Sequence, residues 1–225
     1  MPVVSPDSLK RVDDFSAGRQ ILIFDNAMYK LQKKDLAKAS TVLGKAFHRY
    51  PIFEYIIPDS SYRKKHLKHL CSFLLRCGIS KGEVIAPSKS IEGVSIWLPP
   101  MGTQISAIDD IRAGLLNLYF QVNFKTFNRF MKTGSIKGTK RATIIKRPFY
   151  ICDMIGVDPC SQRHGFGRRM IERKLTEYDR GKMPCYLETS AIGNIYYYEK
   201  FGFDLIDEYK IQDAAVYCLF REPNS

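Results

Sequence analysis

The second half of the chain alternates between two hydrophobic periods, and this alternation constrains the fold more than any other feature of the sequence. Residues 149–157 and 185–189 are patterned as strands, whereas 167–180 and 194–200 repeat their apolar residues at helical spacing. Two further strands are expected after residue 200. Strands that alternate with helices, with parallel neighbours among them, form a layered α/β sheet. We therefore expect an α/β protein of three layers.

The first half of the chain predicts helices on either side of a hairpin. Pro51 and Gly78 are expected to end the first two helices, because proline and glycine interrupt a helical pattern. Pro99 and Pro100 close the hairpin. The expected elements are a short strand at 28–31, a helix from about Lys34 to Pro51, a helix from about Ser61 to Cys77, strands at 83–86 and 91–98, and a helical segment at 105–146.

Length and composition favour one domain in a reducing compartment. Of the 225 residues, 1–26 show little periodicity and predict an N-terminal extension, followed by a single domain at 27–225. The six cysteines are scattered without close pairs, which is typical of reduced thiols. Neither a signal peptide nor a membrane-spanning apolar run is recognisable, so we expect a cytoplasmic protein without a membrane partner.

The charge of the chain is strongly positive and unevenly distributed. Lysine and arginine exceed aspartate and glutamate by 35 to 23, a formal net charge of +12, which favours anionic partners. Residues 111–152 contain nine basic residues and no acidic one, with phenylalanines among them. This pattern is compatible with nucleic-acid or membrane binding. It is equally compatible with helices that pack their aromatic side on a sheet and turn their basic side to water, and we favour such helices around a substrate pocket.

A turn between a strand and a helix carries the clearest chemical signal. Gly165 and Gly167 follow the strand that ends at Val157 and open the helix that runs to Arg180. The unpaired amides and positive dipole end of a helix N-terminus attract anions, and glycines let a pyrophosphate approach the backbone closely. The spacing is neither that of a dinucleotide fingerprint nor that of a P-loop. The pattern therefore indicates a different phosphate-bearing ligand.

The order of motifs around this turn resembles the GNAT superfamily of acetyl-CoA-dependent N-acetyltransferases. Gln162, Gly165 and Gly167 resemble that superfamily's acyl-CoA pyrophosphate loop, and residues 186–190, Asn194 and 198–203 resemble its next strand and helix. Together with residues 97–100 they are most similar to the branch that includes puromycin N-acetyltransferase. The resemblance is strong over 148–209 and thin over 28–147. It implies a GNAT fold with a central mixed sheet of six to seven strands and a helical insertion between strands three and four.

The same resemblance implies acetyl-CoA as the cofactor and assigns residues to it. The pantetheine arm would pair with the strand from Asp153 to Val157, and a backbone amide near Ile155 would face the developing oxyanion. Tyr198 stands where the superfamily keeps the tyrosine that protonates the leaving sulfur, and Asn194, one helical turn earlier, would hold the cofactor. The implied cofactor-binding residues are Ile155, Gly156, Val157, Gln162, Arg163, His164, Gly165, Phe166, Gly167, Arg168 and Asn194.

The proton acceptor is left open between two carboxylates. An amine with a pKa of about 10 is mostly protonated at neutral pH, so a base must take its proton before attack. Glu188 lies in the middle of a predicted strand, where a carboxylate needs a reason, and Asp153 on the preceding strand is the alternative. His66, His69, Cys71 and Cys77 match no standard zinc spacing, so we expect no metal.

These features predict an enzyme that transfers an acetyl group from acetyl-CoA to a primary amine of a small molecule, by direct attack in a ternary complex. The alternatives are a protein acetyltransferase acting on lysine or N-terminal amines, and a non-catalytic module that binds coenzyme A or nucleic acid. We do not expect nucleic acid to be a partner, and we expect a monomer or a homodimer. The shortage of acidic residues in 111–152 argues against a polycationic acceptor.

Overall fold

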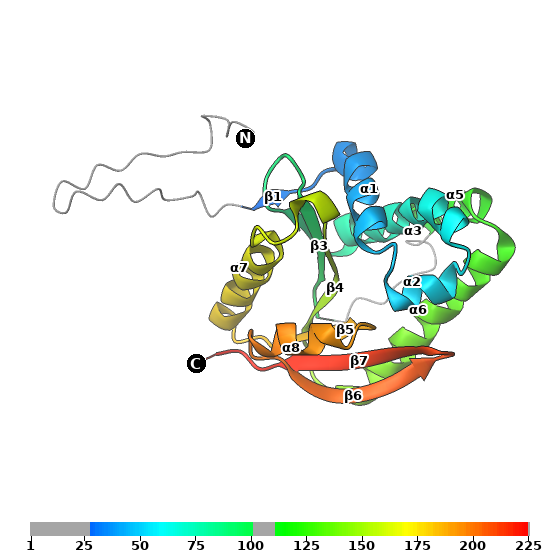
Figure 1. Cartoon of the computed structure of the whole chain (residues 1–225). Helices are drawn as coiled ribbons and strands as arrows, with labels where there is room; N and C mark the ends of the chain where they lie inside the picture. Colours follow the sequence, from blue (N-terminus) through cyan, green and yellow to red (C-terminus); the bar gives the residue numbers. More distant parts are fainter. Residues whose placement is uncertain (1–27, 101–110, 225) are drawn as a thin grey trace, which may run out of the picture.

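The computed structural model describes residues 28–100 and 111–224, so the predicted extension at 1–26 lies outside the described residues. Seven strands form one sheet in the order β1-β2-β3-β4-β5-β7-β6 (Figure 1). Only β4 and β5 are parallel; every other neighbouring pair is antiparallel. The strands are β1 (Tyr29–Lys30), β2 (Glu83–Ala86), β3 (Gly93–Leu98), β4 (Tyr150–Val157), β5 (Cys185–Thr189), β6 (Asp204–Ile211) and β7 (Ala214–Arg221).

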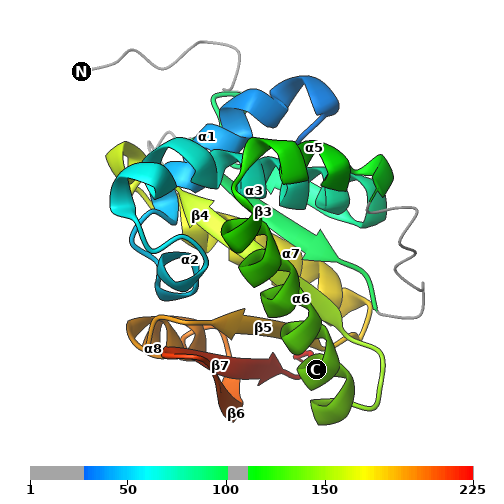
Figure 2. The same cartoon turned by 90° about the vertical axis from the view of Figure 1, so that its right-hand side faces the viewer.

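Helices cover both faces of the sheet and complete three layers (Figure 2). Seven α-helices lie within the described ranges: α1 (Leu36–Ala46), α2 (Pro51–Ile56), α3 (Ser60–Lys81), α5 (Leu115–Gln121), α6 (Phe124–Ile144), α7 (Phe166–Arg180) and α8 (Gly193–Glu199). Two short 3-10 helices, η2 (Lys33–Asp35) and η3 (Pro159–Ser161), join them to the strands. The helices α5 and α6 form the predicted insertion between the third and fourth strands, so the predicted fold class is confirmed.

Alternating side chains on the strands build two hydrophobic cores. On β5, Tyr186 belongs to the core beneath α1, α2 and α3, whereas Cys185 and Leu187 belong to the core beneath α7 and α8. This division follows from the two-residue period of a strand, which sends successive side chains to opposite faces of the sheet. No helix in the described ranges combines the length and the apolar character needed to cross a bilayer.

Pro51 and Gly78 do not end helices as predicted. The first helix already ends at Ala46, and Pro51 instead opens α2, because proline lacks the amide hydrogen that the first turn of a helix leaves unpaired. Gly78 lies inside α3, which continues to Lys81. A Cβ atom at Gly78 would lie 2.6 Å from Cγ2 of Ile96 and 2.9 Å from Cγ2 of Val84. The glycine therefore lets α3 pack closely against the sheet.

The two parallel strands separate halfway along their length. Residues Tyr150 to Cys152 of β4 pair with Cys185 to Leu187 of β5, and the pairing stops there. On its other side β4 stays paired with β3 as far as Val157. Figure 2 shows β4 and β5 running in clearly different directions. The backbone of β4 from residue 153 onward therefore has one edge that no strand of the described chain occupies.

Candidate active site

A cavity of about 460 Å³ lies where β4 and β5 separate. Asp153 and Ile155 of β4, Glu188 of β5, and Asn194 and Tyr198 of α8 all line it. The fold thus brings together the three predicted catalytic residues and two of the predicted cofactor-binding residues. Further walls come from α2, α3 and α6. The sequence led us to expect the insertion, and with it α6, beside a substrate pocket, but it did not link α2 or α3 to the site.

Glu188 is held by two cations from the insertion. Lys137 Nζ lies 2.9 Å from its Oε2, and Arg141 donates from Nε to Oε1 at 2.9 Å and from Nη2 to Oε2 at 3.2 Å. The hydroxyl of Tyr186 also donates to Oε1, at 2.9 Å. Burial of the Glu188 side chain raises its pKa, but Lys137 and Arg141 outweigh this effect and lower the pKa to about 2. Glu188 is therefore a permanent anion at neutral pH.

Asp153 makes fewer contacts with charged and polar groups than Glu188 does. Its Oδ1 accepts from Arg141 Nη2 at 3.3 Å, and 20% of its side chain is exposed, compared with 1% for Glu188. Arg141 thus lies between both carboxylates and joins β4 to β5 across their gap. A carboxylate with one long contact to a cation is freer to bind a substrate or a water molecule than one that is fully enclosed.

Tyr198 is the only one of three consecutive tyrosines that lines the cavity. Its exposure is 7%, whereas Tyr196 and Tyr197 are 67% and 38% exposed. Its ring packs edge-on against Phe203, with 5.9 Å between the centroids. Burial raises the pKa of the Tyr198 hydroxyl well above its ordinary value, so the phenol stays protonated. The position on the helix, not the residue type, separates Tyr198 from its neighbours.

Asn194 connects α8 to the end of β5. Its Nδ2 donates to Oγ1 of Thr189 at 3.0 Å, and the same Oγ1 lies 2.7 Å from the hydroxyl of Tyr50. The amide of Ser190 donates to that hydroxyl as well, at 2.8 Å. This chain of bonds fixes the first turn of α8, and with it Tyr198, relative to the sheet. Asn194 therefore has a structural role in addition to any contact with a ligand.

The turn after β4 presents open amides at the start of α7. Arg163 and Gly165 adopt left-handed conformations, with φ of +66° and +78°, and no side chain caps the helix. No heavy atom lies within 4 Å of a Cβ built on Gly165, and at Gly167 the nearest is the Tyr197 hydroxyl at 3.6 Å. Space for a ligand therefore remains directly above the first turn.

Side chains of this turn support its shape. Gln162 donates to the carbonyl of Val157 at 3.2 Å, and Nδ1 of His164 lies 2.8 Å from the carbonyl oxygen of Gln162. Arg168 donates to Glu172 at 2.7 Å and is 69% exposed. Phe166 is the first residue of α7. Of the residues predicted to bind the cofactor here, Gln162 and His164 thus shape the turn, whereas Arg163 and Arg168 supply positive charge beside it.

Close packing against α1 explains why position 156 is a glycine, which the motif did not suggest. A Cβ at this position would lie 2.8 Å from Cε2 of Phe47 and 3.1 Å from Cβ of Ala46. The glycine lets α1 lie directly on β4, and its face of the strand is closed to a ligand. A contact between a cofactor and Gly156 would have to use the backbone edge.

Lys137 and Arg141 are functional candidates that the sequence did not reveal. The basic side of the insertion was expected to face water, and for these two residues that expectation is wrong. They are four positions apart on α6 and therefore share one face of the helix, which points at Glu188. The signal in the sequence was this spacing, combined with a mid-strand glutamate that lacks a basic partner nearby.

The chain is similar to N-acetyltransferases in sequence and in fold. No family model matches the chain. An uncharacterised N-acetyltransferase of Schizosaccharomyces pombe is 26% identical over 187 residues, which cover 79% of this chain and 74% of the relative.

Two solved structures share the fold. A Corynebacterium glutamicum protein described as histone acetyltransferase HPA2 and related acetyltransferase has a TM-score of 0.63 at 17% identity, covering 88% of this chain and 97% of its own. Arylalkylamine N-acetyltransferase 2 from Aedes aegypti has a TM-score of 0.56 at 14% identity, covering 88% and 99%. These likenesses support the resemblance to GNAT-type N-acetyltransferases, leave the puromycin N-acetyltransferase-like branch a prediction, and confirm that the chain has the GNAT fold.

Proposed function

We propose that this protein transfers the acetyl group of acetyl-CoA to the primary amine of a small molecule, by direct attack within a ternary complex. The observation that carries the proposal is the cavity itself: it joins a buried tyrosine, two carboxylates and the free edge of β4 in one space. The N-acetyltransferase relative supports the reaction class. The acceptor and the roles of individual residues are inferred from the geometry.

The first turn of α7 is suited to the pyrophosphate of acetyl-CoA. The amides from Gly165 to Arg168 precede the first hydrogen bond of the helix, which Arg169 donates to the carbonyl of Gly165. Unpaired amides and the helix dipole favour an anion there. Open space at Gly165 and the absence of a side chain at Gly167 let the phosphates reach the backbone. Arg163 and Arg168 then add attraction that is partly screened by water.

The gap between β4 and β5 is suited to the pantetheine arm. An extended chain with amide groups pairs with a free strand edge as an additional strand does. The free edge of β4 begins at Asp153, where pairing with β5 stops, and runs towards the turn before α7. A chain held by the α7 turn at one end would therefore bring its sulfur into the cavity beside Tyr198 at the other end.

Tyr198 is our candidate for the group that hydrogen-bonds the leaving sulfur. When the amine nitrogen bonds to the acetyl carbon, the bond from carbon to sulfur breaks and the sulfur needs a proton. A thiol has a pKa of about 8.5. The pKa of Tyr198 is raised well above that of an ordinary phenol, so Tyr198 donates a hydrogen bond without becoming a lasting anion. The proton that finally rests on sulfur replaces one that the amine nitrogen loses.

Asp153 is our candidate for the base, in preference to Glu188. Lys137 and Arg141 lower the pKa of Glu188 to about 2, and their contacts, together with that of Tyr186, leave the Glu188 oxygens little access to an amine. Asp153 contacts a single cation at 3.3 Å and is 20% exposed, so an ammonium group or a bridging water molecule can reach its carboxylate. Glu188 positions Arg141 and Lys137, and we assign it a structural role.

The walls of the cavity favour an acceptor with an apolar or aromatic body. Lys137 and Arg141 are balanced by Asp153 and Glu188, and Lys81 is a third cation of the lining, so the cavity has no net negative charge to attract a polycation. The amine would meet the carboxylates while its body contacts the remaining walls. Those walls include Phe47, Tyr50, Ile52, Phe53, Ile56, Phe73, Leu74, Phe130 and Met131.

A test is to incubate the purified protein with acetyl-CoA and a panel of amines while free thiol is measured. Arylalkylamines and aminonucleosides of the puromycin type should release thiol faster than spermine or a lysine-containing peptide. Preference for the peptide would favour the protein acetyltransferase. Coenzyme A binding without thiol release for any amine would favour the non-catalytic module.

A further inference from the structure

One side of the molecule lacks acidic residues over two packed segments. The helix α3 contains no aspartate or glutamate, and neither does the segment 111–152 that includes α5 and α6. Two hydrogen bonds join these segments: the carbonyl of Gln121 lies 3.0 Å from Nδ1 of His66, and the amide of Asn123 donates to the hydroxyl of Tyr62 at 2.7 Å. Exposed basic residues of these two segments include Lys64, Lys65, Lys68, Arg76, Arg112, Lys125 and Lys132.

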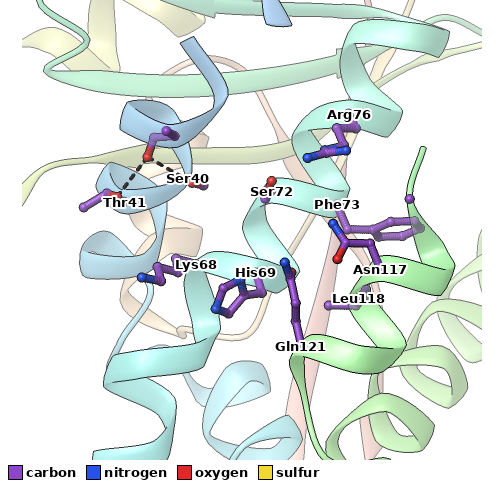
Figure 3. Close-up of a pocket in the computed structure, with 12 residues that line it drawn as sticks. Ser40, Thr41, Lys68, His69, Ser72, Phe73, Arg76, Asn117, Leu118 and Gln121 are labelled. Carbon is purple, nitrogen blue, oxygen red and sulfur yellow. Dashed lines mark hydrogen bonds between the residues drawn. The ribbon is translucent and has the colours of Figure 1, made fainter. Parts of the chain in front are cut away.

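A second cavity, of about 260 Å³, opens on this basic side between α1, α3 and α5 (Figure 3). Lys68, Ser72 and Arg76 stand on successive turns of α3 and face it, and Asn117 and Gln121 face it from α5. None of the residues that line it is acidic. Neither Lys68 nor Arg76 forms an ion pair with another residue in 28–100 or 111–224. Among the residues that the structure describes, the cavity therefore combines two cations that have no acidic partner with several hydrogen-bond donors.

His69 adds a donor but no charge to this cavity. Burial lowers the pKa of its imidazole, and the neighbouring Lys68 lowers it further. The ring is therefore neutral at neutral pH, and the positive charge comes from Lys68 and Arg76 alone. On the opposite wall, the hydroxyls of Ser40 and Thr41 both donate to the carbonyl of Ala37, at 3.1 Å and 2.9 Å. Their lone pairs do not change the preference of the cavity for an anion such as a phosphate group.

An exposed apolar ridge lies beside the cavity at the corner between α5 and α6. We use this name for four residues: Leu116, Tyr119, Phe120 and Phe124. Phe120 is 81% exposed, Phe124 68% and Leu116 59%. Leu116 and Phe120 immediately precede Asn117 and Gln121 in sequence, so the ridge and the cavity occupy adjacent faces of α5. Large apolar side chains gathered at such exposure mark a surface that contacts something apolar.

We propose that this side of the protein docks on a membrane that contains anionic phospholipids, with a lipid phosphate group in the cavity and the apolar ridge among the acyl chains. Apolar side chains next to a basic face are what interfacial binding requires. Nucleic acid would also be attracted by the positive charge, and its bases stack on aromatic rings such as those of Phe120 and Phe124. However, Tyr119 already packs edge-on against Phe120 and Phe127, and Leu116, 59% exposed, has no ring on which a base could stack. An acyl-chain environment uses all four ridge residues, so we favour the membrane. A free phosphate compound would leave the ridge in water.

The proposal is tested by sedimentation of the full-length protein with phosphatidylcholine vesicles, with and without phosphatidylserine. Binding should be at least about tenfold tighter with phosphatidylserine, because each basic residue near an anionic surface contributes on the order of 1 kcal/mol. It should weaken at about 1 M salt, where the screening length falls to about 3 Å. Equal binding to neutral vesicles, or no binding to either, overturns the proposal.

Two pairs of variants separate the cavity from the ridge. Lys68→Gln with Arg76→Gln should weaken vesicle binding by roughly 30-fold, which corresponds to two basic contacts. Arg173→Gln with Arg180→Gln, on the exposed side of α7, should leave it unchanged. Phe120→Ser should weaken binding by roughly tenfold, whereas Leu205→Ser, at a residue 45% exposed on β6, should not. Equal losses in test and control variants contradict the docking surface.

Two further measurements test whether the surface binds a soluble anion or a nucleic acid instead. Inorganic phosphate is titrated into the protein while the amide signals of α3 are followed by NMR. If phosphate binds in the cavity but Phe120→Ser has no effect on vesicle sedimentation, the site is one for a soluble anion and the proposal is wrong. If duplex DNA or RNA binds where vesicles do not, a nucleic-acid surface replaces it. Thiol release from acetyl-CoA in solution should be unchanged in all four variants, which separates this proposal from the catalytic one.

Discussion

Arg141 is the residue on which the chemistry of the site depends most. It contacts both carboxylates across the gap between β4 and β5, yet it contacts them unequally. Glu188 receives two hydrogen bonds from Arg141 and an ion pair from Lys137, whereas Asp153 receives one long hydrogen bond. The two carboxylates of the cavity therefore differ: Glu188 is fixed as an anion, whereas Asp153 is accessible to a bound molecule.

This difference between Asp153 and Glu188 predicts distinct effects for replacing each carboxylate with its amide. Asp153→Asn should lower kcat/KM by about 10²- to 10⁴-fold with little change in stability, because the proposed base is lost. Glu188→Gln should lower the free energy of unfolding by roughly 3–5 kcal/mol, since Lys137 and Arg141 lose their partner. Steady-state assays measure the first effect and urea unfolding measures the second. If Asp153→Asn keeps full activity and Glu188→Gln loses activity without losing stability, the assignment is reversed.

Tyr198 should matter for turnover and not for binding of the cofactor. Tyr198→Phe removes only the hydroxyl, so we expect kcat to fall by about 10²-fold or more while the Kd for acetyl-CoA stays within about twofold. Tyr196→Phe is the matched control, because Tyr196 is 67% exposed and lies two residues away on the same helix. Steady-state kinetics with calorimetric titration provide both values. Unchanged turnover in Tyr198→Phe excludes the proposed role.

At the scale of elements, the first turn of α7 gives a test of cofactor binding that leaves the cavity untouched. Gly167→Leu should fill the open space above the helix amides and raise the Kd for coenzyme A by at least about tenfold. The nearest atom to a Cβ there is 3.6 Å away, so the melting temperature should hardly change. Gly138→Leu on α6 is the control, because no atom lies within 4 Å of a Cβ at that position. Equal affinities in the two variants would place the cofactor elsewhere.

Elements with a regular period could be predicted from the sequence, and elements defined by their contacts could not. The strand at 185–189 has the predicted bounds because it is short, apolar and closed by polar residues. In contrast, the sequence did not predict α2 or the last turn of α3, because proline and glycine, as at Pro51 and Gly78, are compatible with two structural roles. Proline both ends a helix and begins one, and glycine both ends a helix and permits close packing. Only the neighbouring sheet decides between them.

At the scale of the whole molecule, the contacts of Glu188 join the insertion to the far half of the sheet and make stability depend on pH. The pKa of Glu188 is about 2 in the folded state, below the value of about 4.3 expected in the unfolded chain. A lowered pKa stabilises the fold above the unfolded value, and this stabilisation is lost as the pH falls towards 2. It contributes on the order of 2–3 kcal/mol at neutral pH.

We therefore expect the free energy of unfolding to decrease between about pH 4 and pH 2, with a smaller decrease in Glu188→Gln. Urea unfolding at a series of pH values, followed by circular dichroism, measures both curves. Other carboxylates titrate in the same range, so the difference between the two proteins is the relevant quantity. Parallel curves would show that Glu188 is not held by the cations of α6.

The candidate site could be predicted in part because its residues fall in two classes. Asn194, Tyr198 and the turn at 162–168 are close in sequence to strands and glycines that mark them. The remaining walls come from α2, α3 and α6, which reach the site only when the chain is folded. The four-residue spacing of Lys137 and Arg141 places them on one face of a helix, but it does not show that this face turns inward, because basic residues on a helix usually face water. The acceptor cavity therefore depends on the whole fold.

The central claim is that the α7 turn and the free edge of β4 hold acetyl-CoA with its sulfur beside Tyr198. The most direct measurement is a titration of the isotopically labelled protein with coenzyme A, followed through the amide signals of the chain. We expect the amide signals of residues 153–157, 163–168 and 194–198 to shift saturably. In Gly167→Leu the same shifts should require much more coenzyme A. Absence of shifts at these residues at millimolar coenzyme A, or shifts confined to another surface, would contradict it.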